Sequence, residues 1–114
     1  MPTTYNYKIL GQLAPTNTSE TTLYTVPAST QAVISTLVLI PLTTSAAAYR
    51  VSVRPSGGTV GLSMYRLISD LTLPPGASVF VTGIGITLGA GDIVSVLTGT
   101  ANAIGFHLYG SEYV

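Results

Sequence analysis

The chain has 114 residues, and only 7% of them are Asp, Glu, Lys or Arg, against roughly 25% in an ordinary soluble domain. Its four basic and four acidic residues give a net charge of zero, which excludes the basic surface that nucleic-acid-binding proteins use to hold phosphates. The absence of cysteine excludes disulfides, thiolate metal sites and a cysteine nucleophile. Because so uncharged a surface tolerates packing against a neighbour, the composition indicates a subunit of an assembly.

The apolar residues are too dispersed for a membrane protein. The mean hydropathy is +0.54, but the most apolar run, Ala32–Leu42, contains Pro41 and is far shorter than the ~20 residues of a membrane helix. The first residues, Met1–Tyr5, have no basic region and no apolar stretch, so we expect no secretory signal. The length predicts one domain over residues 1–114.

Short runs rich in Val, Ile, Leu, Thr and Tyr alternate with turn residues about every 8–12 positions, which predicts an all-β sandwich or barrel. In chain order, strands are expected at Tyr5–Gly11, Thr21–Val26, Gln31–Ile40, Ala48–Arg54, Met64–Leu67, Ser78–Leu88, Asp92–Leu97 and Ala103–Tyr109. Turns are expected at Pro27–Ser29, Pro55–Gly58, Pro74–Gly76 and Gly89–Asp92, where Pro and Gly suit the backbone angles.

Alternation within the runs indicates one buried face per strand. In the last run, Ile104, Phe106 and Leu108 point to one face and His107 to the other. The run Val33–Ile40 loses this alternation, which predicts a central strand covered on both faces, one of them by a partner subunit. About eight antiparallel strands in one domain predict a jelly-roll-like antiparallel β-sandwich.

Candidates for catalysis are few. His107 is the only histidine, and its partners in a hydrolytic triad would have to come from Asp70, Asp92, Glu20 or Glu112. The chain has no G-x-S-x-G motif, and one histidine with four scattered carboxylates offers no clustered metal site. We therefore expect no enzyme activity, no cofactor and no metal, with His107 packed or at an interface and Asp70 and Asp92 in turns.

Two further motifs are weak. The run Gly83–Gly89 differs by one residue from a dinucleotide-binding fingerprint and has no following helix, so its glycines predict a bulge within a strand. The sequence Asn17–Ser19 fits an N-glycosylation site, which we interpret as a chance match because no secretory signal is expected.

The interface candidates are arginines and tyrosines. Arg50 and Arg54 lie on the same side of one predicted strand, next to Tyr49, and Arg and Tyr are enriched at protein interfaces. The two arginines are either polar anchors for a partner or solvated side chains that keep the domain soluble. Near the N-terminus, Tyr5 and Tyr7 belong to a segment that could clasp a neighbour.

Several segments together carry a likeness to a known class of proteins: Tyr7–Gln12, Thr22–Thr30 with the following apolar run Ala32–Ile40, Tyr49–Gly57, Ile86–Val96 and Phe106–Glu112. In these segments, which cover most of the chain, the sequence resembles small virion structural proteins of tailed bacteriophages, including cyanophages. The stretch Gly61–Leu73 departs from the pattern, because apolar residues stand there in place of polar ones. The resemblance implies a β-sandwich without enzymatic activity that is present in many copies per particle.

Two functions follow from this interpretation. The first is a capsid decoration (cement) protein, a homotrimer on the capsid exterior that binds the major capsid protein and stabilises the assembled head. The alternative is a tail-fibre or host-recognition module that binds cell-surface glycans. The absence of tryptophan and the scattering of the seven tyrosines favour the first, because sugars usually stack on exposed aromatic faces.

Overall fold

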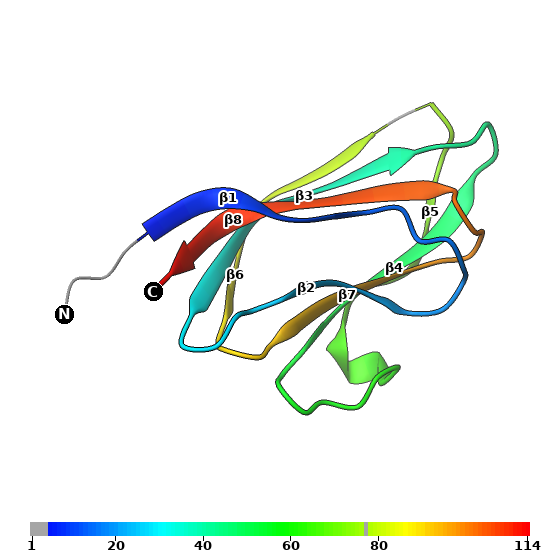
Figure 1. Ribbon diagram of the computed structural model, residues 1–114. Coiled ribbons are helices and arrows are strands. Elements are labelled where there is room, and N and C mark those ends of the chain that lie inside the picture. The colour runs from blue at the N-terminus through cyan, green and yellow to red at the C-terminus, as the bar shows by residue number, and fades with distance from the viewer. Residues whose placement is uncertain (1–4, 77) are drawn as a thin grey trace.

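The computed structural model describes residues 5–76 and 78–114, and its strands form two packed antiparallel sheets (Figure 1). One sheet has the order β1-β8-β3-β6 and the other the order β2-β7-β4-β5. The elements of the described chain are β1 (Tyr5–Leu13), β2 (Thr21–Thr25), β3 (Gln31–Pro41), β4 (Ala47–Arg54), the 3-10 helix η1 (Ser63–Tyr65), β5 (Arg66–Leu73), β6 (Val79–Leu88), β7 (Ile93–Thr98) and β8 (Ile104–Tyr113). The described residues contain no helix that is long and apolar enough to cross a membrane.

The strand pairing explains how one chain makes both sheets. Antiparallel pairs form between β1 and β8, β2 and β7, β3 and β6, and β4 and β5. The chain therefore follows the path of one long hairpin that is wrapped over itself, with its bend between β4 and β5. The two remaining pairs, β3 with β8 and β4 with β7, join neighbouring turns of the wrapped hairpin. This confirms the prediction of a jelly-roll-like antiparallel sandwich.

The core lies between the sheets and follows the predicted alternation. Ile104, Phe106 and Leu108 of β8 are at most 1% exposed, and Ile34 and Leu39 of the adjacent β3 are equally buried. From the other sheet, Val51, Val94 and Val96 meet them in the same cluster. Because these inward positions are occupied by β-branched and large apolar side chains, burial of one face holds each strand in register.

The fifth strand was placed wrongly from the sequence. A strand was expected at Met64–Leu67, but residues 63–65 form η1 and β5 runs from Arg66 to Leu73. Asp70, expected between strands, lies inside β5 with a φ of +55° at a bulge opposite β4. Asp is common in turns and tolerates the left-handed conformation, so the sequence predicts a turn at this position. In the structure, β4 pairs with β5 on both sides of Asp70, which makes it part of a bulge.

The glycine run in β6 forms the expected bulge. Between the pairs Ile34–Ile86 and Thr36–Thr82, β6 has two more residues than β3, and Gly85 there has a φ of +55°. Glycine adopts this left-handed conformation at little cost, whereas a residue with a Cβ would be strained in it. The predicted central position of the third strand is also confirmed, because β3 lies between β8 and β6, whereas its cover by a partner subunit stays a prediction.

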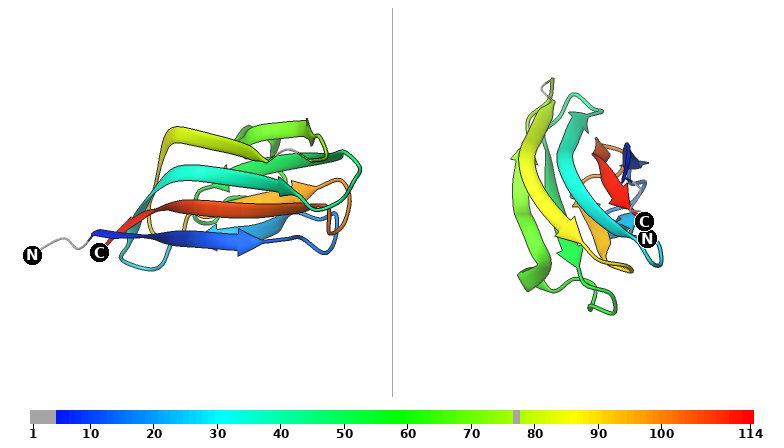
Figure 2. Two further views of the ribbon diagram at one scale, coloured as in Figure 1. Left: turned by 90° about the horizontal axis from the view of Figure 1, so that it is seen from above. Right: turned by 90° about the vertical axis from the view of Figure 1, so that its left-hand side faces the viewer.

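The two open sides of the sandwich differ (Figure 2). The edge strands β1 and β2 lie against each other, and a Cβ on Gly11 would be only 2.5 Å from the carbonyl oxygen of Leu23. The edge strands β5 and β6 have almost no close backbone approach. The core is thus sealed along one edge and leaves an apolar cleft along the other.

Candidate interaction surface

The outer face of the β1-β8-β3-β6 sheet carries no charged side chain among its described residues. Alternation and register assign the outward positions, because their neighbours in each strand face the core. We call this surface the charge-free face, and its residues are Tyr7, Ile9, Gln12, Gln31, Val33, Thr36, Val38, Ile40, Phe80, Thr82, Thr87, Gly105, His107, Tyr109, Ser111 and Tyr113. It is a surface of hydroxyl, amide, aliphatic and aromatic groups.

The side chains of the charge-free face lie in rows across the four strands. One row runs from Gln12 through His107 and Val38 to Phe80. Gln12 Nε2 lies 3.0 Å from Nδ1 of His107, and the His107 ring stacks on Tyr109 with ring centroids 6.2 Å apart. These contacts fix the central rings, so the middle of the face presents a pre-organised surface rather than free side chains.

Large apolar groups stand out at both borders of the charge-free face. Tyr7 on β1 is 85% exposed, Ile9 beside it is half exposed, and Phe80 on β6 is 65% exposed. Single exposed apolar residues are common on proteins, but a face that combines them with a lack of charge among its described residues marks a surface suited to being covered.

The two charged residues of this sheet point away from that face. Lys8 Nζ is 3.2 Å from Oε1 of Glu112, and Oε2 of Glu112 accepts a hydrogen bond from the hydroxyl of Tyr24 on β2. The Tyr24 hydrogen bond, followed by the Lys8 contact, lowers the pKa of Glu112 despite its burial. Burial and the same carboxylate raise the pKa of Tyr24. The cluster joins the two sheets, because Lys8 and Glu112 lie on β1 and β8 and Tyr24 lies on β2.

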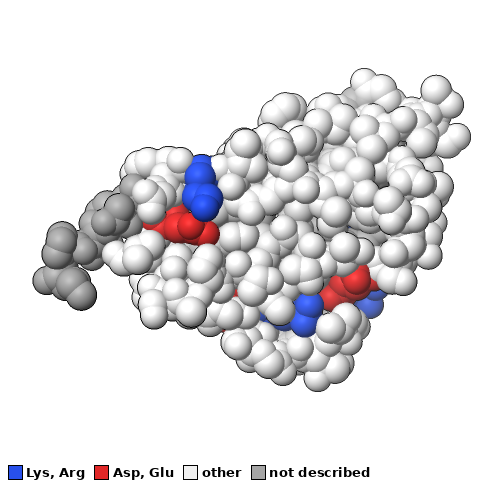
Figure 3. Space-filling view, viewed as in Figure 1, with Lys and Arg blue, Asp and Glu red and all other residues white. Residues whose placement is uncertain are grey.

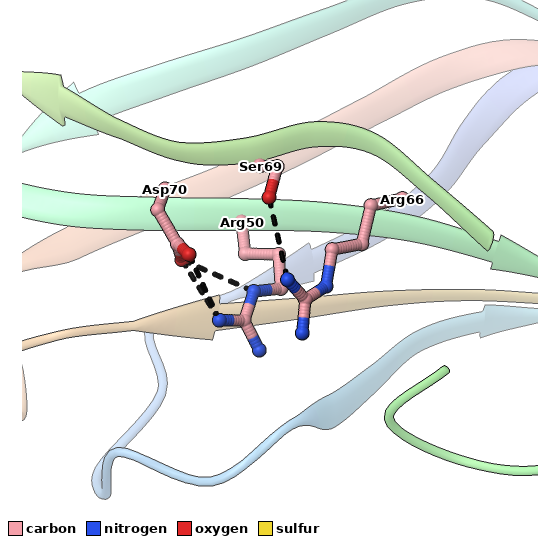
Figure 4. A network of polar contacts seen from close by, with 4 residues as sticks. All are labelled: Arg50, Arg66, Ser69 and Asp70. Atoms are coloured by element: carbon pink, nitrogen blue, oxygen red, sulfur yellow. Dashed lines mark hydrogen bonds and ion pairs between the residues drawn. The ribbon is translucent and has the colours of Figure 1, made fainter. Parts of the chain in front are cut away.

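The outer face of the β2-β7-β4-β5 sheet is different, because it carries most of the charges. Arg50 on β4 donates through Nε and Nη2 to both carboxylate oxygens of Asp70 on β5, at 2.9–3.1 Å (Figure 4). Beside it, Nη1 of Arg66 donates to Oγ of Ser69 at 3.3 Å. The bulge that turns Asp70 out of the ladder thus places its carboxylate on the arginine of the neighbouring strand.

A second ion pair on this sheet is nearly enclosed. Arg54 Nε lies 3.4 Å from Oε2 of Glu20, and both side chains are less than a tenth exposed. Oε2 of Glu20 also accepts a hydrogen bond from Ser95, and Nη1 of Arg54 donates to the carbonyl of Gly58. In the view of Figure 3 the charged atoms occupy two small areas, and the rest of the visible described surface is uncharged.

The structure separates the five residues expected at an interface. Tyr49 is only 5% exposed and Arg54 is 7% exposed, so both side chains pack within the molecule. Arg50 is engaged by Asp70, whereas Tyr7 is open to solvent. The side chain of Tyr5 lies outside the described residues. The assignment of these residues to an interface stays a prediction, and among the four with described side chains Tyr7 is the one whose exposure suits it best.

The candidates for chemistry are dispersed over the fold. The described residues contain no group of three or more His, Asp or Glu side chains that could hold a metal ion. Asp92 accepts hydrogen bonds from the backbone N–H groups of Gly89 and Ser56 at 2.8 and 3.0 Å, the turn role expected of it. His107 lies on β8 in the charge-free face, whereas Asp70 lies on β5 of the other sheet and Asp92 in the turn before β7.

Sequence reasoning missed the charge-free face as a unit. Alternation identified which residues of each strand point outward, but strand order decides which outward residues become neighbours. Gln12, His107, Val38 and Phe80 are brought into one row by pairs that are up to 95 residues apart in the chain. The signal in the sequence is that the outward-facing described residues of four separate strands are all uncharged.

No family model and no curated protein matches the sequence. The fold, however, is similar to chains in solved virus structures. A chain from an infectious bursal disease virus particle aligns with a TM-score of 0.57 and 12% identity, over 97% of this chain and 30% of that chain. A chain from the Gx strain of the same virus aligns with a TM-score of 0.52 and 13% identity, over 99% of this chain and 33% of that chain.

A chain in the acidic stable capsid structure of Helicobacter pylori bacteriophage KHP30 is similar over nearly its whole length. The TM-score is 0.55 and the identity 13%, over 99% of this chain and 94% of that chain. This chain thus spans about a third of the length of the infectious bursal disease virus chains, but nearly the full length of the phage chain. At such low identity these similarities establish a shared fold.

Proposed function

We propose that this chain is a virion structural protein that decorates an assembled capsid. Its charge-free face binds the shell and is covered by it. The observation that carries the proposal is the contrast between that face and the rest of the molecule. Every described charged side chain lies outside it, whereas its borders expose Tyr7, Ile9 and Phe80. Similarity of fold to chains of viral capsid structures supports the broader part of the proposal, a structural role in a virion.

The proposed action is mechanical. A protein that binds only the assembled shell stabilises that state by mass action, in proportion to its affinity and concentration. A typical interface covers about 800 Å² on each partner. The molecule exposes 5886 Å², so contacts with the major capsid protein and with other copies would cover a large share of its surface. The exterior position, the major capsid protein as partner and a trimeric state are parts of this proposal.

The phage KHP30 chain supports the proposal that a domain with this fold acts as a capsid component. Its alignment covers nearly all of both chains, so a chain of about this length with this fold is present in a solved capsid structure. In the infectious bursal disease virus chains the same fold makes up only about a third of a longer polypeptide.

The test is a charge placed on the charge-free face. Thr36 lies in the middle of that face on the central strand β3, so Thr36→Lys would bury an ammonium group against the shell without a partner. We expect at least a 100-fold loss of affinity, about 2.7 kcal/mol, for empty capsids of the encoding virus that lack this protein. Sedimentation of capsids with bound protein measures the affinity.

The matched control is Thr22→Lys, which adds the same side chain to an exposed position on the other sheet. We expect capsid binding within about threefold of the original protein, and melting temperatures close to the original for both variants. Equal binding by both variants would overturn the proposed docking face. A copy number per virion close to that of a tail component, with no binding to empty capsids, would overturn decoration in favour of a tail role.

A further inference from the structure

The open edge of the sandwich exposes an apolar cleft between the two sheets. The cleft has a volume of about 240 Å³ and is bordered by Leu67 and Ile68 of β5 and by Val81 and Ile86 of β6. Its floor is formed by core residues of β3, β4, β7 and β8, and every lining residue is apolar. A domain of this size ordinarily closes its core, so an apolar opening of this kind is a site for apolar groups from outside.

The form of the cleft restricts what can occupy it. Its volume lies below the roughly 300–1,000 Å³ of sites for small molecules, and none of its lining residues has a polar side chain to orient one. A whole added strand is disfavoured as well, because β5 is bulged at Asp70 and β6 at Gly85, and bulges interrupt the regular edge that strand addition needs. What fits is one or two apolar side chains carried by a protruding loop.

The chain itself carries such a loop. Between β4 and β5, Val60, Leu62 and Met64 are exposed, Met64 to 78%, and η1 has no buried residue. We call these three residues the loop tip. In Figure 1 the segment projects beyond the body of the sandwich. Methionine is unbranched and flexible, and it fills irregular apolar gaps well.

We propose that the loop tip of one copy inserts into the β5/β6 cleft of a neighbouring copy, with Met64 as the inserted side chain. Both surfaces are apolar, and neither brings a charge that would have to be desolvated. Because the tip and the cleft are different surfaces, the contact is heterologous, and such contacts close into rings when the rotation allows. The trimer expected from the sequence is one such ring.

The size of the contact indicates where it operates. Burial of a complete aliphatic side chain removes roughly 60–120 Å² from water, so the partly exposed tip would bury roughly 100–200 Å². This is a quarter or less of the ~800 Å² per partner of a stable interface. The contact therefore rests on the proposed function, since copies held side by side on a shell reach millimolar effective concentrations. At micromolar concentration in solution, the protein stays monomeric.

The absence of cysteine from the chain permits a direct test. Met64→Cys places a thiol on the loop tip, and Val81→Cys places one in the cleft. The two variants are mixed at millimolar concentration under mild oxidation, and mixed disulfides are identified by mass spectrometry. The control replaces Val81→Cys by Thr82→Cys, which presents the thiol one residue away on the opposite side of β6. Ile86→Cys serves as a second cleft variant in case Val81→Cys impairs folding.

We expect the tip–cleft pair to cross-link at least tenfold faster than the control pair, and the rate to fall tenfold when Leu62→Glu is added to the tip variant. Equal rates for the two pairs would overturn the inference. A disulfide within single molecules of a Met64→Cys/Val81→Cys protein at micromolar concentration would also overturn it, because the tip would then fill its own cleft. The test uses purified protein, so its failure is distinct from a failure of capsid binding.

Discussion

The outer faces of the two sheets differ in the number of charged side chains that they carry. On the β2-β7-β4-β5 sheet, Arg50 is paired with Asp70, and Arg54 with Glu20. On the β1-β8-β3-β6 sheet, the described outward residues are all uncharged, and the Lys8–Glu112 pair turns toward the other sheet. The uncharged surface therefore lies on the outer side of one sheet, and most of the charged side chains lie on the other sheet.

This difference bears on what an arginine does on a nearly uncharged protein, because it can either bind a partner or form an ion pair within the molecule. Arg50 and Arg54 are each paired with a carboxylate within the molecule, and Nη1 of Arg54 also donates to a backbone carbonyl, although the buried Nε of Arg54 has no hydrogen bond. A partner that engaged them would have to break these contacts first. The charge-free face has no such cost, because water is the main competitor for its surface. An assembly contact is therefore expected on the uncharged side, and structural ion pairs on the other.

The largest expected effect on stability comes from the cluster of Lys8, Glu112 and Tyr24, which faces inward from the charge-free face. Glu112→Ala removes the acceptor of the buried Tyr24 hydroxyl and the partner of Lys8, at a cost of about 3 kcal/mol in the free energy of unfolding. Urea unfolding measures it. Tyr24→Phe and the double variant complete a cycle, in which the double variant is expected to cost less than the sum of the two single changes. Additive costs would contradict the coupling of the two sheets through this bond.

The same cluster makes stability depend on pH. Because the hydrogen bond from Tyr24 lowers the pKa of Glu112 below its ordinary value of 4.5, the carboxylate stabilises the fold above that pH. The contribution is lost as the pH falls through the lowered pKa of the folded protein. We expect the stability difference between the original protein and Glu112→Ala to be constant from pH 7 to about pH 5 and to narrow below it. Unfolding midpoints measured along this range would contradict the linkage if the difference stayed constant in acid.

The sequence was sufficient for the architecture because the signals were local. Alternation in Ile104, Phe106 and Leu108 and the turn residues between runs depend only on neighbours in the chain, and seven of the eight expected strands overlap the observed ones closely. The exception, β5, begins after η1 and contains Asp70 in a left-handed conformation. Its exposed apolar residues and its bulge obscured the period of two on which the assignment depended.

The surface was harder to predict because it depends on pairings between distant segments. The sequence places Arg50 and Arg54 on one side of a strand, but it does not show that Asp70 and Glu20 come to meet them. The sequence suggests Tyr49 for an interface, but its side chain faces inward from β4 and belongs to the core cluster together with Val51. A short uncharged segment is unremarkable alone, and only strand order combines four of them into one face.

The smallest expected effect comes from the exposed pair on the other face. Asp70→Asn keeps a residue that tolerates a φ of +55°, so it removes the charge without adding backbone strain. The carboxylate of Asp70 is about half exposed, so the cost is expected to be at most about 1 kcal/mol at low salt and to vanish in 1 M NaCl. Capsid affinity should not change, because Asp70 lies on the sheet opposite the charge-free face. A loss of capsid affinity comparable to that of Thr36→Lys would show instead that the charged side meets the shell.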